Sequence, residues 1–459
     1  KVQVPTMRKK EEPFNIRIIS EDRWGNPTNK LETNFKISSN LPINGLQKKI
    51  NSKSQKNGVL LIEGLTVSSP GDLKIDLFNS EGDRLTSSNP LRIVKDSELT
   101  HYWGELHGQS EETIGTNSIY DYFVFGRDKA GLDVIVHQGN DFQITNEFWD
   151  KIQDMTKQFL EEEKFITFPG YEWSGNTGLG GDRNVLFFQE GEIIRRSSHA
   201  LVSDFSDIEN DCNSSDELFR ALKETKTIVF AHVGGRYADI ESHEGNLERS
   251  VEIHSAWGTF EWLLQDALRL GYRVGIVSNS DGHKGRPGAS YPGASMFGSY
   301  GGLTCMLARK LTREMIWESL FHRHHYGTTG NRIFMDVNVL LKTPGKIFEE
   351  DPRLGGNDSK NSLVGIMGDI IQTNENNATL KIEIIASAPI EKLEIRNSLK
   401  VLETVRPYKK IDLGKRIRII WGGAEYRGRG RETVWNGFAS LEGNEIESFK
   451  PINFYNLEK

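Results

Sequence analysis

The sequence predicts an α/β fold for residues 99–332, flanked by a β region at each end of the chain. Within 99–332, short apolar runs alternate with segments that carry one apolar helical face, a pattern typical of a parallel sheet covered by helices. Residues 1–98 and 333–459 instead show the apolar–polar alternation of half-buried strands. Polar residues of metal-binding type follow most of the apolar runs, and the C-terminal ends of parallel strands are where α/β barrels carry their chemistry.

Residues 1–98 are expected to form a small β-sandwich-like domain. Strand patterns occur at 15–19 and 73–78, and turn-forming sequences such as Glu81-Gly82-Asp83 separate the strands. This region contains no histidine, so we expect a structural or oligomeric role for it rather than a binding role.

Buried strands are predicted in the middle region at short runs that are almost wholly apolar. These runs are 134–136, 165–168, 228–230, 251–253 and 274–277. Seven residues of metal-binding type lie in this region, most of them directly after such a run: His107, His137, Glu172, His232, His254, Asp281 and His283.

Helices are predicted between the strands from capping residues followed by one apolar face. Thr145 precedes an apolar face of Phe148, Ile152, Met155 and Phe159, and Ser214 with Glu217 has the spacing of a capping box. Thr259 is expected to open a helix that Gly271 ends, and Thr312 to open the last helix of the region.

Residues 333–459 are expected to form a second β-domain. Strand alternation is clear at 379–385 and at 416–421, with a polar, glycine-containing loop at 351–361. The sequence Arg427-Gly428-Arg429-Gly430-Arg431 resembles arginine–glycine RNA-binding segments, but it is brief and adjoins a predicted strand in an acidic protein. We expect a structured loop there.

The bulk properties fit a globular protein of about three domains, since the chain has 459 residues, 36% of them hydrophobic and 26% charged. A net charge of −7 argues against a general nucleic-acid binder. No apolar stretch approaches the roughly 18–20 residues that cross a bilayer.

Cys212 and Cys305 are too few and too far apart for a disulfide scaffold, so a reducing cytoplasm is expected. The chain begins without a methionine or a signal-peptide core, and we expect an internal or trimmed start.

Two short segments place polar side chains on one face at alternate positions. In an extended chain Glu105, His107 and Gln109 share a face, and Asp281 with His283 repeats that spacing. Each pair alone is weak support for a metal site. Together with ligand-type residues after several buried strands they indicate one, because buried imidazoles and carboxylates are costly unless they are paired or bound to a cation.

Five motifs in the middle region resemble successive motifs of the PHP (polymerase and histidinol phosphatase) superfamily, and most closely a large PHP-like branch of unknown function. The motifs are Trp103-Gly104-Glu105-Leu106-His107, Gly131-Leu132-Asp133, Phe168-Pro169-Gly170-Tyr171-Glu172-Trp173, Ala231-His232-Val233-Gly234-Gly235 and Ser280-Asp281-Gly282-His283-Lys284-Gly285-Arg286-Pro287-Gly288. The resemblance implies a distorted seven-stranded (β/α) barrel between two β-sandwich-like domains. It also implies one to three divalent metals and a metal-bound hydroxide that attacks a phosphoester.

The metal ligands implied by position are His107, Glu172, His232, Asp281 and His283. The sequence departs from the superfamily pattern twice. Gln109 stands where the first motif has a second histidine, and His137-Gln138-Gly139-Asn140-Asp141 stands where the second motif has Asp-His. Either one metal position is lost, or Gln109, His137, Asn140 or Asp141 re-forms it. We favour a rebuilt site that holds one or two divalent transition metals (Mn, Zn or Fe).

Three arginines follow proposed ligands on loops: Arg183, Arg236 and Arg286. We expect Arg183 to stabilise developing negative charge, and Arg236 and Arg286 to bind a small anionic substrate. The alternative is that they are loop arginines or ion-pair partners of buried carboxylates. The glycine-rich loop before Arg183 lacks a nucleotide-binding fingerprint.

The remaining histidines are weaker candidates. His254 is a candidate general acid or metal ligand, with a structural histidine as the alternative. His322, His324 and His325 end the last predicted helix, where cationic side chains favour the helix dipole, so we expect no metal site there. His199 and His243 have no supporting context.

Two functions of different classes follow. The first is a metal-dependent hydrolase whose metal-activated water attacks a phosphoester or a related anionic ester. The second is a non-catalytic metal- or ligand-binding protein with a degenerate PHP-like barrel, which the departures at Gln109 and His137 favour. A homo-oligomer is compatible with either function.

Overall fold

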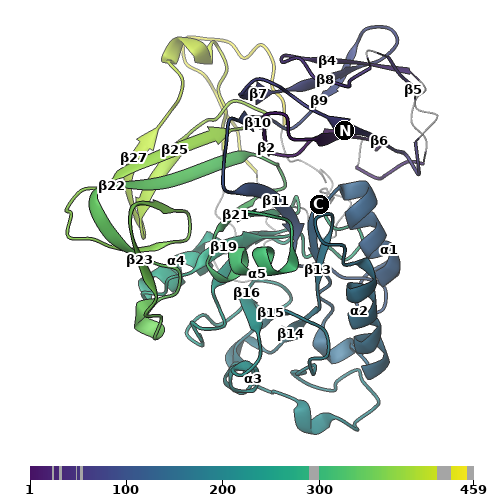
Figure 1. Cartoon of the computed structure of the whole chain (residues 1–459), viewed down its shortest axis with the longest axis vertical. Helices are drawn as coiled ribbons and strands as arrows, with labels where there is room; N and C mark the ends of the chain where they lie inside the picture. The colour runs from purple at the N-terminus through teal and green to yellow at the C-terminus, as the bar shows by residue number, and fades with distance from the viewer. Residues whose placement is uncertain are drawn as a thin grey trace.

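The computed structural model describes residues 1–22, 25–29, 34–47, 49–51, 55–288, 299–420 and 436–451. It is a mixed α/β structure with several sheets and few helices (Figure 1). In the described residues, no helix is both long and apolar enough to cross a membrane.

The N-terminal strands form three small sheets around one apolar core. Their bounds are β1 (Val2–Gln3), β2 (Met7–Lys9), β3 (Phe14–Ile19), β4 (Asn34–Ser39), β5 (Lys49–Asn51), β6 (Val59–Leu65), β7 (Gly71–Leu73), β8 (Ile75–Phe78), β9 (Arg84–Ser87) and β10 (Leu91–Val94). The sheet orders are β1-β3-β6, β2-β10-β7 and β5-β4-β8-β9. The predicted strand at 15–19 is confirmed as β3. The one predicted at 73–78 is interrupted at Lys74, where the chain passes from one sheet to another.

The middle region contains two mixed sheets. The first has the order β13-β12-β11-β20-β21, from β11 (Thr100–Glu105), β12 (Val134–Val136), β13 (Ile166–Phe168), β20 (Leu303–Ala308) and β21 (His325–Thr328). The second has the order β14-β15-β16-β17-β18 with β19 beside β17, from β14 (Gly170–Ser174), β15 (Asp182–Phe187), β16 (Thr227–Ala231), β17 (Ser250–Ser255), β18 (Gly258–Thr259) and β19 (Gly275–Ser278).

All five apolar runs that predicted buried strands are strands, namely β12, β13, β16, β17 and β19. The expected parallel pairing holds for β11–β12, β12–β13, β16–β17 and β17–β19. The pairs β14–β15, β15–β16, β11–β20 and β20–β21 are antiparallel, which the alternation of strands and helices did not predict. The closed seven-stranded barrel stays a prediction.

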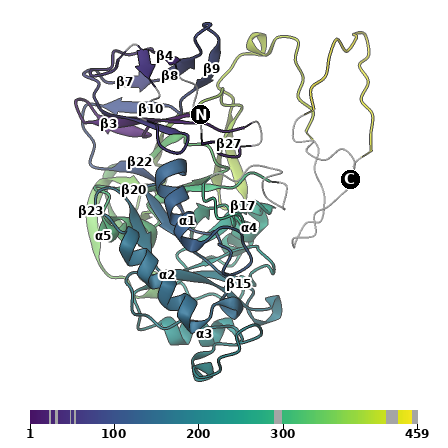
Figure 2. The same ribbon diagram turned by 90° about the vertical axis from the view of Figure 1, so that its right-hand side faces the viewer.

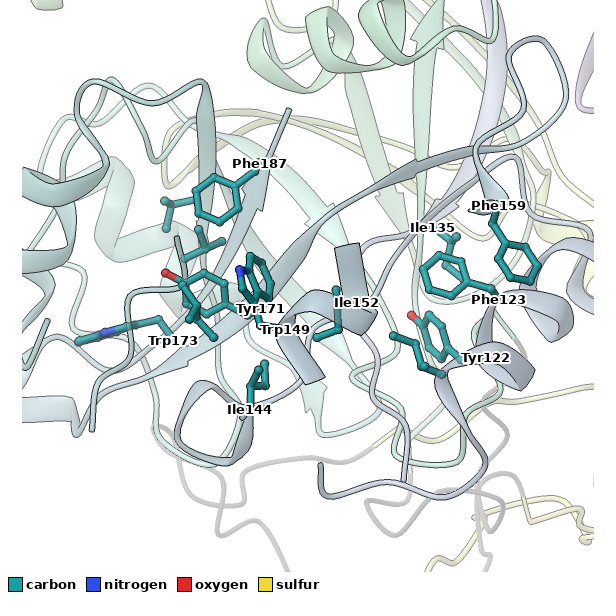
Figure 3. Close-up of a cluster of buried hydrophobic side chains, with 14 of the residues drawn as sticks. Tyr122, Phe123, Ile135, Ile144, Trp149, Ile152, Phe159, Tyr171, Trp173 and Phe187 are labelled. Atoms are coloured by element: carbon teal, nitrogen blue, oxygen red, sulfur yellow. The ribbon is translucent and has the colours of Figure 1, made fainter. Parts of the chain in front are cut away.

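The helices are α1 (Ile119–Val124), which continues into a π-helical turn (Phe125–Ala130), α2 (Asn146–Phe159), α3 (Ser215–Leu222), α4 (Glu261–Arg269) and α5 (Arg313–Phe321). The predicted apolar face of α2 packs into the core of the middle region. Figure 3 shows Trp149 against Tyr171 on one side, with ring centroids 5.6 Å apart, and Phe123 near Phe159 on the other. Ile152 of α2 lies between these two groups. This helix therefore anchors the strands that carry the candidate site.

The predicted helix caps are confirmed at Thr145, Ser214 and Thr312, whose side chains accept a hydrogen bond from a backbone N–H in the first turn. A reciprocal capping box was expected here but is not formed. The Glu217 side chain accepts a hydrogen bond from the N–H of Asn213 rather than from that of Ser214. The prediction at Thr259 is wrong. The helix begins at Glu261 without a side-chain cap, and Thr259 instead belongs to β18. Gly271 ends this helix as predicted, with a left-handed φ of 80°.

The C-terminal strands are β22 (Phe334–Phe348), β23 (Ser359–Ile366), β24 (Ile370–Gln372), β25 (Thr379–Ile385), β26 (Leu393–Asn397) and β27 (Lys400–Val405). The long strand β22 pairs with β23, β24 and β25, and β26 pairs with β27. The strand predicted at 379–385 is therefore confirmed as β25.

The strand predicted at 416–421 is wrong for its described residues, 416–420. These residues lie in no strand and are exposed, with Ile417 at 72%. Figure 2 shows the C-terminal part, coloured yellow, extending away from the rest of the molecule. Alternation alone does not make a strand, because its N–H and C=O groups also need a neighbouring strand. The segment 427–431 lies outside the described residues.

Candidate metal centre

Three residues from separate parts of the chain bring their ligand atoms together. His107 follows β11, Glu172 lies in β14, and His232 follows β16 directly. Their ligand atoms all lie within 4.8 Å of one another, and all three side chains are buried. The Glu172 carboxylate lies between the imidazoles, with Oε2 3.6 Å from Nε2 of His107 and Oε1 3.7 Å from Nε2 of His232. These residues form the three-ligand group.

The imidazole nitrogens that face Glu172, and one oxygen of the neighbouring Asp281, lack hydrogen-bond partners. Nε2 of His107, both ring nitrogens of His232 and Oδ1 of Asp281 are buried without a hydrogen bond from any described residue. Leaving such atoms unpaired costs about 1–3 kcal/mol each, so their convergence in one place needs an explanation.

A divalent cation accounts for both the distances and the missing partners. Ligands that bind one ion at about 2.1 Å with tetrahedral angles lie about 3.4 Å from each other. The separations of 3.6 and 3.7 Å within the group are close to that value. Two imidazoles and a carboxylate form a donor set that suits zinc, manganese or iron.

Asp281 and His283 adjoin the three-ligand group. Oδ1 of Asp281 lies 3.3 Å from Nε2 of His107, and Nε2 of His283 lies 3.7 Å from the same oxygen. Asp281 has a left-handed φ of 48°, a conformation that costs energy for a residue other than glycine. Its N–H donates to the carbonyl of His107 at 2.9 Å, and Gln109 N donates to the carbonyl of Gly282 at 2.9 Å. These bonds fix the turn that directs the carboxylate toward His107.

The two buried imidazoles of the site have pKa values that are shifted in opposite directions. Burial alone lowers the pKa of His107, but the carboxylates of Asp281, Glu252 and Glu172 outweigh burial and raise it well above the usual value. Burial lowers the pKa of His232 well below the usual value, and the positive charge of His107 adds to that effect. Burial raises the pKa of Asp281 to about 7 despite its contact with His107. Protons and a cation would therefore compete for the same atoms.

Glu252 supports the site and was not among the predicted residues. Its Oε1 lies 3.1 Å from Nδ1 of His107, and its Oε2 accepts a hydrogen bond from Nδ2 of Asn279 at 2.6 Å. A carboxylate on the far nitrogen of a ligating histidine fixes the orientation of the ring and raises its basicity. The sequence did carry a signal for this role: Glu252 is the one charged residue in the run 251–253.

The two positions that depart from the superfamily pattern behave differently. Gln109 lies at the site, but its Nε2 donates to Oε2 of Glu172 at 3.1 Å, so it holds the carboxylate in place. His137 lies outside the three-ligand group. Its Nε2 contacts Oγ of Ser110 at 2.9 Å, and its ring packs edge-on against Tyr122 and Phe148. Burial lowers the pKa of His137 to about 4.

Asn140 and Asp141, the other candidates to re-form a metal position, hold the backbone and side chain of Ser174. Asn140 Nδ2 donates to Ser174 Oγ at 3.0 Å, and Ser174 N donates to Asp141 Oδ1 at 3.1 Å. Neither belongs to the three-ligand group. Burial raises the pKa of Asp141 to about 6.

The expected catalytic role of Arg183 does not fit its contacts. The side chain is fully buried, and each of its five N–H groups donates within the protein. Nε donates to Oε1 of Glu248 at 2.8 Å, and the other N–H groups donate to the carbonyls of Gly180, Gly181, Asp239 and Ser242. With no donor left for a substrate, Arg183 is a structural ion-pair residue, as in the alternative stated above.

Arg236 and Arg286 are more open. Arg236 is 30% exposed, and its Nε donates to Oδ1 of Asp182 at 2.8 Å. Its two Nη atoms donate to no residue in the described part of the chain. Arg286 donates from Nη1 to Oδ1 of Asn26 at 2.9 Å, which directs it toward the N-terminal region. Of the three predicted arginines, Arg236 retains the most capacity to bind an anion.

His254 fits the structural alternative better than the catalytic one. Its Nδ1 contacts Oγ1 of Thr259 at 2.8 Å, and its Nε2 donates to the carbonyl of Tyr300 at 2.9 Å. Both ring nitrogens are thus engaged, and burial lowers its pKa. A general acid at this position would first have to leave both partners.

The remaining histidines lie outside the three-ligand group and contact other polar side chains. His199 pairs with Asp207 and Asp211, His243 with Glu248, His324 with Asp369, and His325 with Ser250. Among the described residues, His322, His324 and His325 form no group that could hold a metal ion. His322 lies at the end of α5, where burial lowers its pKa to about 4.

Comparisons with known proteins give few relatives. No protein-family model matches the chain. An uncharacterized protein of Chlamydia pneumoniae is 26% identical over 375 residues, which cover 74% of this chain and 57% of the relative. An uncharacterized protein of Chlamydia muridarum is 23% identical over 370 residues, which cover 75% and 58%. The chain thus spans less than two thirds of the length of these relatives.

Two solved structures show low similarity. One is a two-domain protein from Bacteroides vulgatus that contains a predicted PHP-like metal-dependent phosphoesterase, with a TM-score of 0.36 and 11% identity. That match covers 64% of this chain and 89% of the other. The second is PhoD, with a TM-score of 0.18 and 9% identity, covering 51% of this chain and 52% of the other.

Proposed function

We propose that this chain is a metal-dependent hydrolase that acts on a phosphoester or a related anionic ester. The observation that carries the proposal is the convergence of buried imidazole nitrogens from His107 and His232 on the Glu172 carboxylate, with Oδ1 of Asp281 3.3 Å from Nε2 of His107. We assign these four residues as ligands of one or two divalent transition metals, with His283 as a further candidate. The motif resemblance in the sequence supports the same ligand set.

A bound divalent metal would lower the pKa of a coordinated water and polarise the bond under attack. The protein supplies orientation and charge. Glu252 holds the ring of His107, and Gln109 holds the carboxylate of Glu172. The Asp182 carboxylate accepts hydrogen bonds from the backbone N–H and the Nε of Arg236 and so fixes that side chain. The Nη atoms of Arg236 are left to bind an anionic group.

The second candidate is a metal- or ligand-binding protein without catalysis. Gln109 favours it, because an amide that donates to Glu172 is not a metal ligand in this arrangement. The saturation of Arg183 also favours it, since it removes one of the expected charge-stabilising groups.

We also propose domains at 1–98, 99–332 and 333–459. The strands support this division, because each described sheet draws its strands from one of the three segments.

The test combines metal content with a substrate panel. Wild-type protein, His232→Ala and a control, His322→Ala, are analysed for metal and assayed on phosphate monoesters, phosphate diesters and carboxylic esters. The hydrolase proposal predicts turnover of a phosphoester by the wild type and by the control, and its loss in His232→Ala. Bound metal without turnover on any ester would favour the binding-protein alternative, and a folded wild type unable to take up metal would overturn the hydrolase proposal.

A further inference from the structure

A cavity lies at the opposite end of β16 from the three-ligand group. It has a volume of about 280 Å³ and is lined by Thr227, the first residue of β16, and by the ends of neighbouring elements. His232 follows the last residue of β16. The two ends are therefore about 16 Å apart, at roughly 3.3 Å per residue along a strand. A ligand in this cavity would not contact the candidate metal centre.

Positive charge dominates the charged lining of this cavity. Lys223, Lys226 and Arg249 line it, against one carboxylate, Glu244. Glu244 accepts a hydrogen bond from the N–H of Asn246 at 3.1 Å, so part of its charge is engaged locally. An anion placed among the three cations would be attracted by all of them.

Arg249 is the clearest sign of a missing anion. The residue is 3% exposed, and its Nη1 is buried without a hydrogen-bond partner among the described residues. Nε donates to the carbonyl of Asn246 at 3.1 Å, and the guanidinium lies 4.0 Å over the ring of Phe321. The nearest carboxylate, that of the half-exposed Glu350, is 3.9 Å from Nη2, beyond hydrogen-bond distance. A buried guanidinium whose ion pair is this long and partly exposed is weakly compensated, so a bound anion would stabilise it further.

Lys226 places a second cation at the edge of the cavity. Its Nζ lies 3.5 Å from the centre of the Phe188 ring and 5.9 Å from that of Trp317. It also contacts Glu314 at 3.3 Å, and it is 46% exposed, so it can turn toward a ligand without leaving the surface. Leu247, Trp317 and Phe321 give the cavity an apolar wall beside these charges.

We propose that this cavity binds a small phosphate-bearing ligand at a site separate from the candidate metal centre. A phosphate dianion matches several cations that approach from different sides, and the guanidinium can donate to two of its oxygens. The apolar wall suits a small organic group attached to the phosphate. The site depends on no residue of the metal centre.

The test measures binding of inorganic phosphate to the full chain by calorimetry at constant ionic strength. The wild type is expected to bind with a Kd on the order of 1 mM or tighter. The double variant Lys223→Glu/Lys226→Glu and the variant Arg249→Gln should each weaken binding at least about tenfold, or about 1.4 kcal/mol. The control Lys400→Glu, an exposed lysine on β27, should bind as the wild type does.

Two further arms separate this site from its alternatives. His232→Ala should bind phosphate at this site as the wild type does, because the cavity is remote from the three-ligand group. Loss of binding in His232→Ala with retention in the lysine and arginine variants would place phosphate at the metal centre and overturn the proposal. Equal affinity for acetate, or no binding of phosphate to the wild type, would also overturn it. Both lysines are exposed, so Lys223→Glu/Lys226→Glu is expected to fold. This double variant tests the phosphate site even if Arg249→Gln does not fold.

Discussion

Two buried polar clusters of the middle region differ in how completely their atoms are paired. In the cluster of Arg183, Glu248 and His243, the carboxylate accepts from Arg183 at 2.8 Å and contacts His243 at 2.9 Å, and every N–H of the guanidinium donates. In the three-ligand group of His107, Glu172 and His232, the facing atoms stay 3.6 and 3.7 Å apart. The first spacing is that of hydrogen bonds and the second that of ligands around an ion. The completeness of hydrogen bonding therefore distinguishes the cluster of Arg183, which stabilises the fold, from the three-ligand group, which suits a cation.

Substitution of a ligand should have the largest effect. His232→Ala is expected to lower metal affinity at least about 1000-fold, equivalent to about 4 kcal/mol, because it removes one of three converging ligands. The free energy of unfolding of the metal-free protein should fall only through the lost packing of the buried ring, since both ring nitrogens of His232 lack hydrogen-bond partners in the described structure. Competition with a chromogenic chelator measures the affinity, and denaturant titration measures the stability. Metal binding that survives the substitution would place the ion elsewhere.

The paired cluster should respond in the opposite way. Arg183→Met leaves the buried carboxylate of Glu248 without its main partner and is expected to cost about 3–5 kcal/mol of stability. The protein that remains folded should bind metal as the wild type does. Urea denaturation followed by metal analysis of the folded fraction checks both expectations. A stable Arg183→Met protein that has lost its metal would reverse the assignment of the two clusters.

A smaller loss of metal affinity is expected when Glu252, which orients the ring of His107, is substituted. Glu252→Gln keeps the size of the side chain but removes its charge, and is expected to weaken metal binding about 10–100-fold. The matched control is Glu147→Gln on an exposed position of α2, which should not change affinity. An unchanged affinity in Glu252→Gln would show that the contact of Glu252 with His107 contributes to packing alone.

A smaller effect concerns acid sensitivity at a histidine outside the site. Burial lowers the pKa of His101 to about 4, and its Nε2 donates to the carbonyl of Met335 at 3.2 Å. The unfolded chain takes up this proton below a pKa of about 6.5, whereas the folded chain does not until about pH 4, so stability falls as pH falls between these values. The loss from His101 between pH 7 and pH 5 is about 2 kcal/mol.

The variant His101→Gln retains a donor for the carbonyl of Met335 and does not titrate. It should therefore show a shallower decrease of stability between pH 7 and pH 5 than the wild type, measured by urea denaturation at each pH. Identical slopes for the two proteins would mean that His101 takes up its proton at the same pH in the folded and the unfolded chain.

Local pattern accounts for the parts that the sequence predicted. The apolar runs of β12, β13, β16, β17 and β19 and the caps at Thr145, Ser214 and Thr312 depend on neighbours within a few residues. Four of the expected ligand residues also lie together, since each follows or lies in a strand of the middle sheets. The combination of ligand type and strand end thus predicted that His107, Glu172, His232 and Asp281 lie close together, and their role as metal ligands stays a proposal.

The parts that the sequence did not predict depend on distant partners. Arg183 was expected to face a substrate, but its partner Glu248 lies 65 residues further along the chain. Glu252 contacts His107 across 145 residues, and although its charge stands out in an apolar run, no local pattern indicates which residue it contacts. The alternation at 416–420 predicted a strand that finds no partner in the described chain. These failures have one cause: hydrogen-bond partners are set by tertiary structure and not by local pattern.

The most direct test of the account is a metal titration of the wild-type full chain, with His107→Ala alongside. The account predicts that the wild type binds at least one divalent transition metal per chain with high affinity and that His107→Ala does not. A folded wild type that takes up no metal, or a His107→Ala protein that binds as tightly, would contradict the assignment of the three-ligand group as a metal centre.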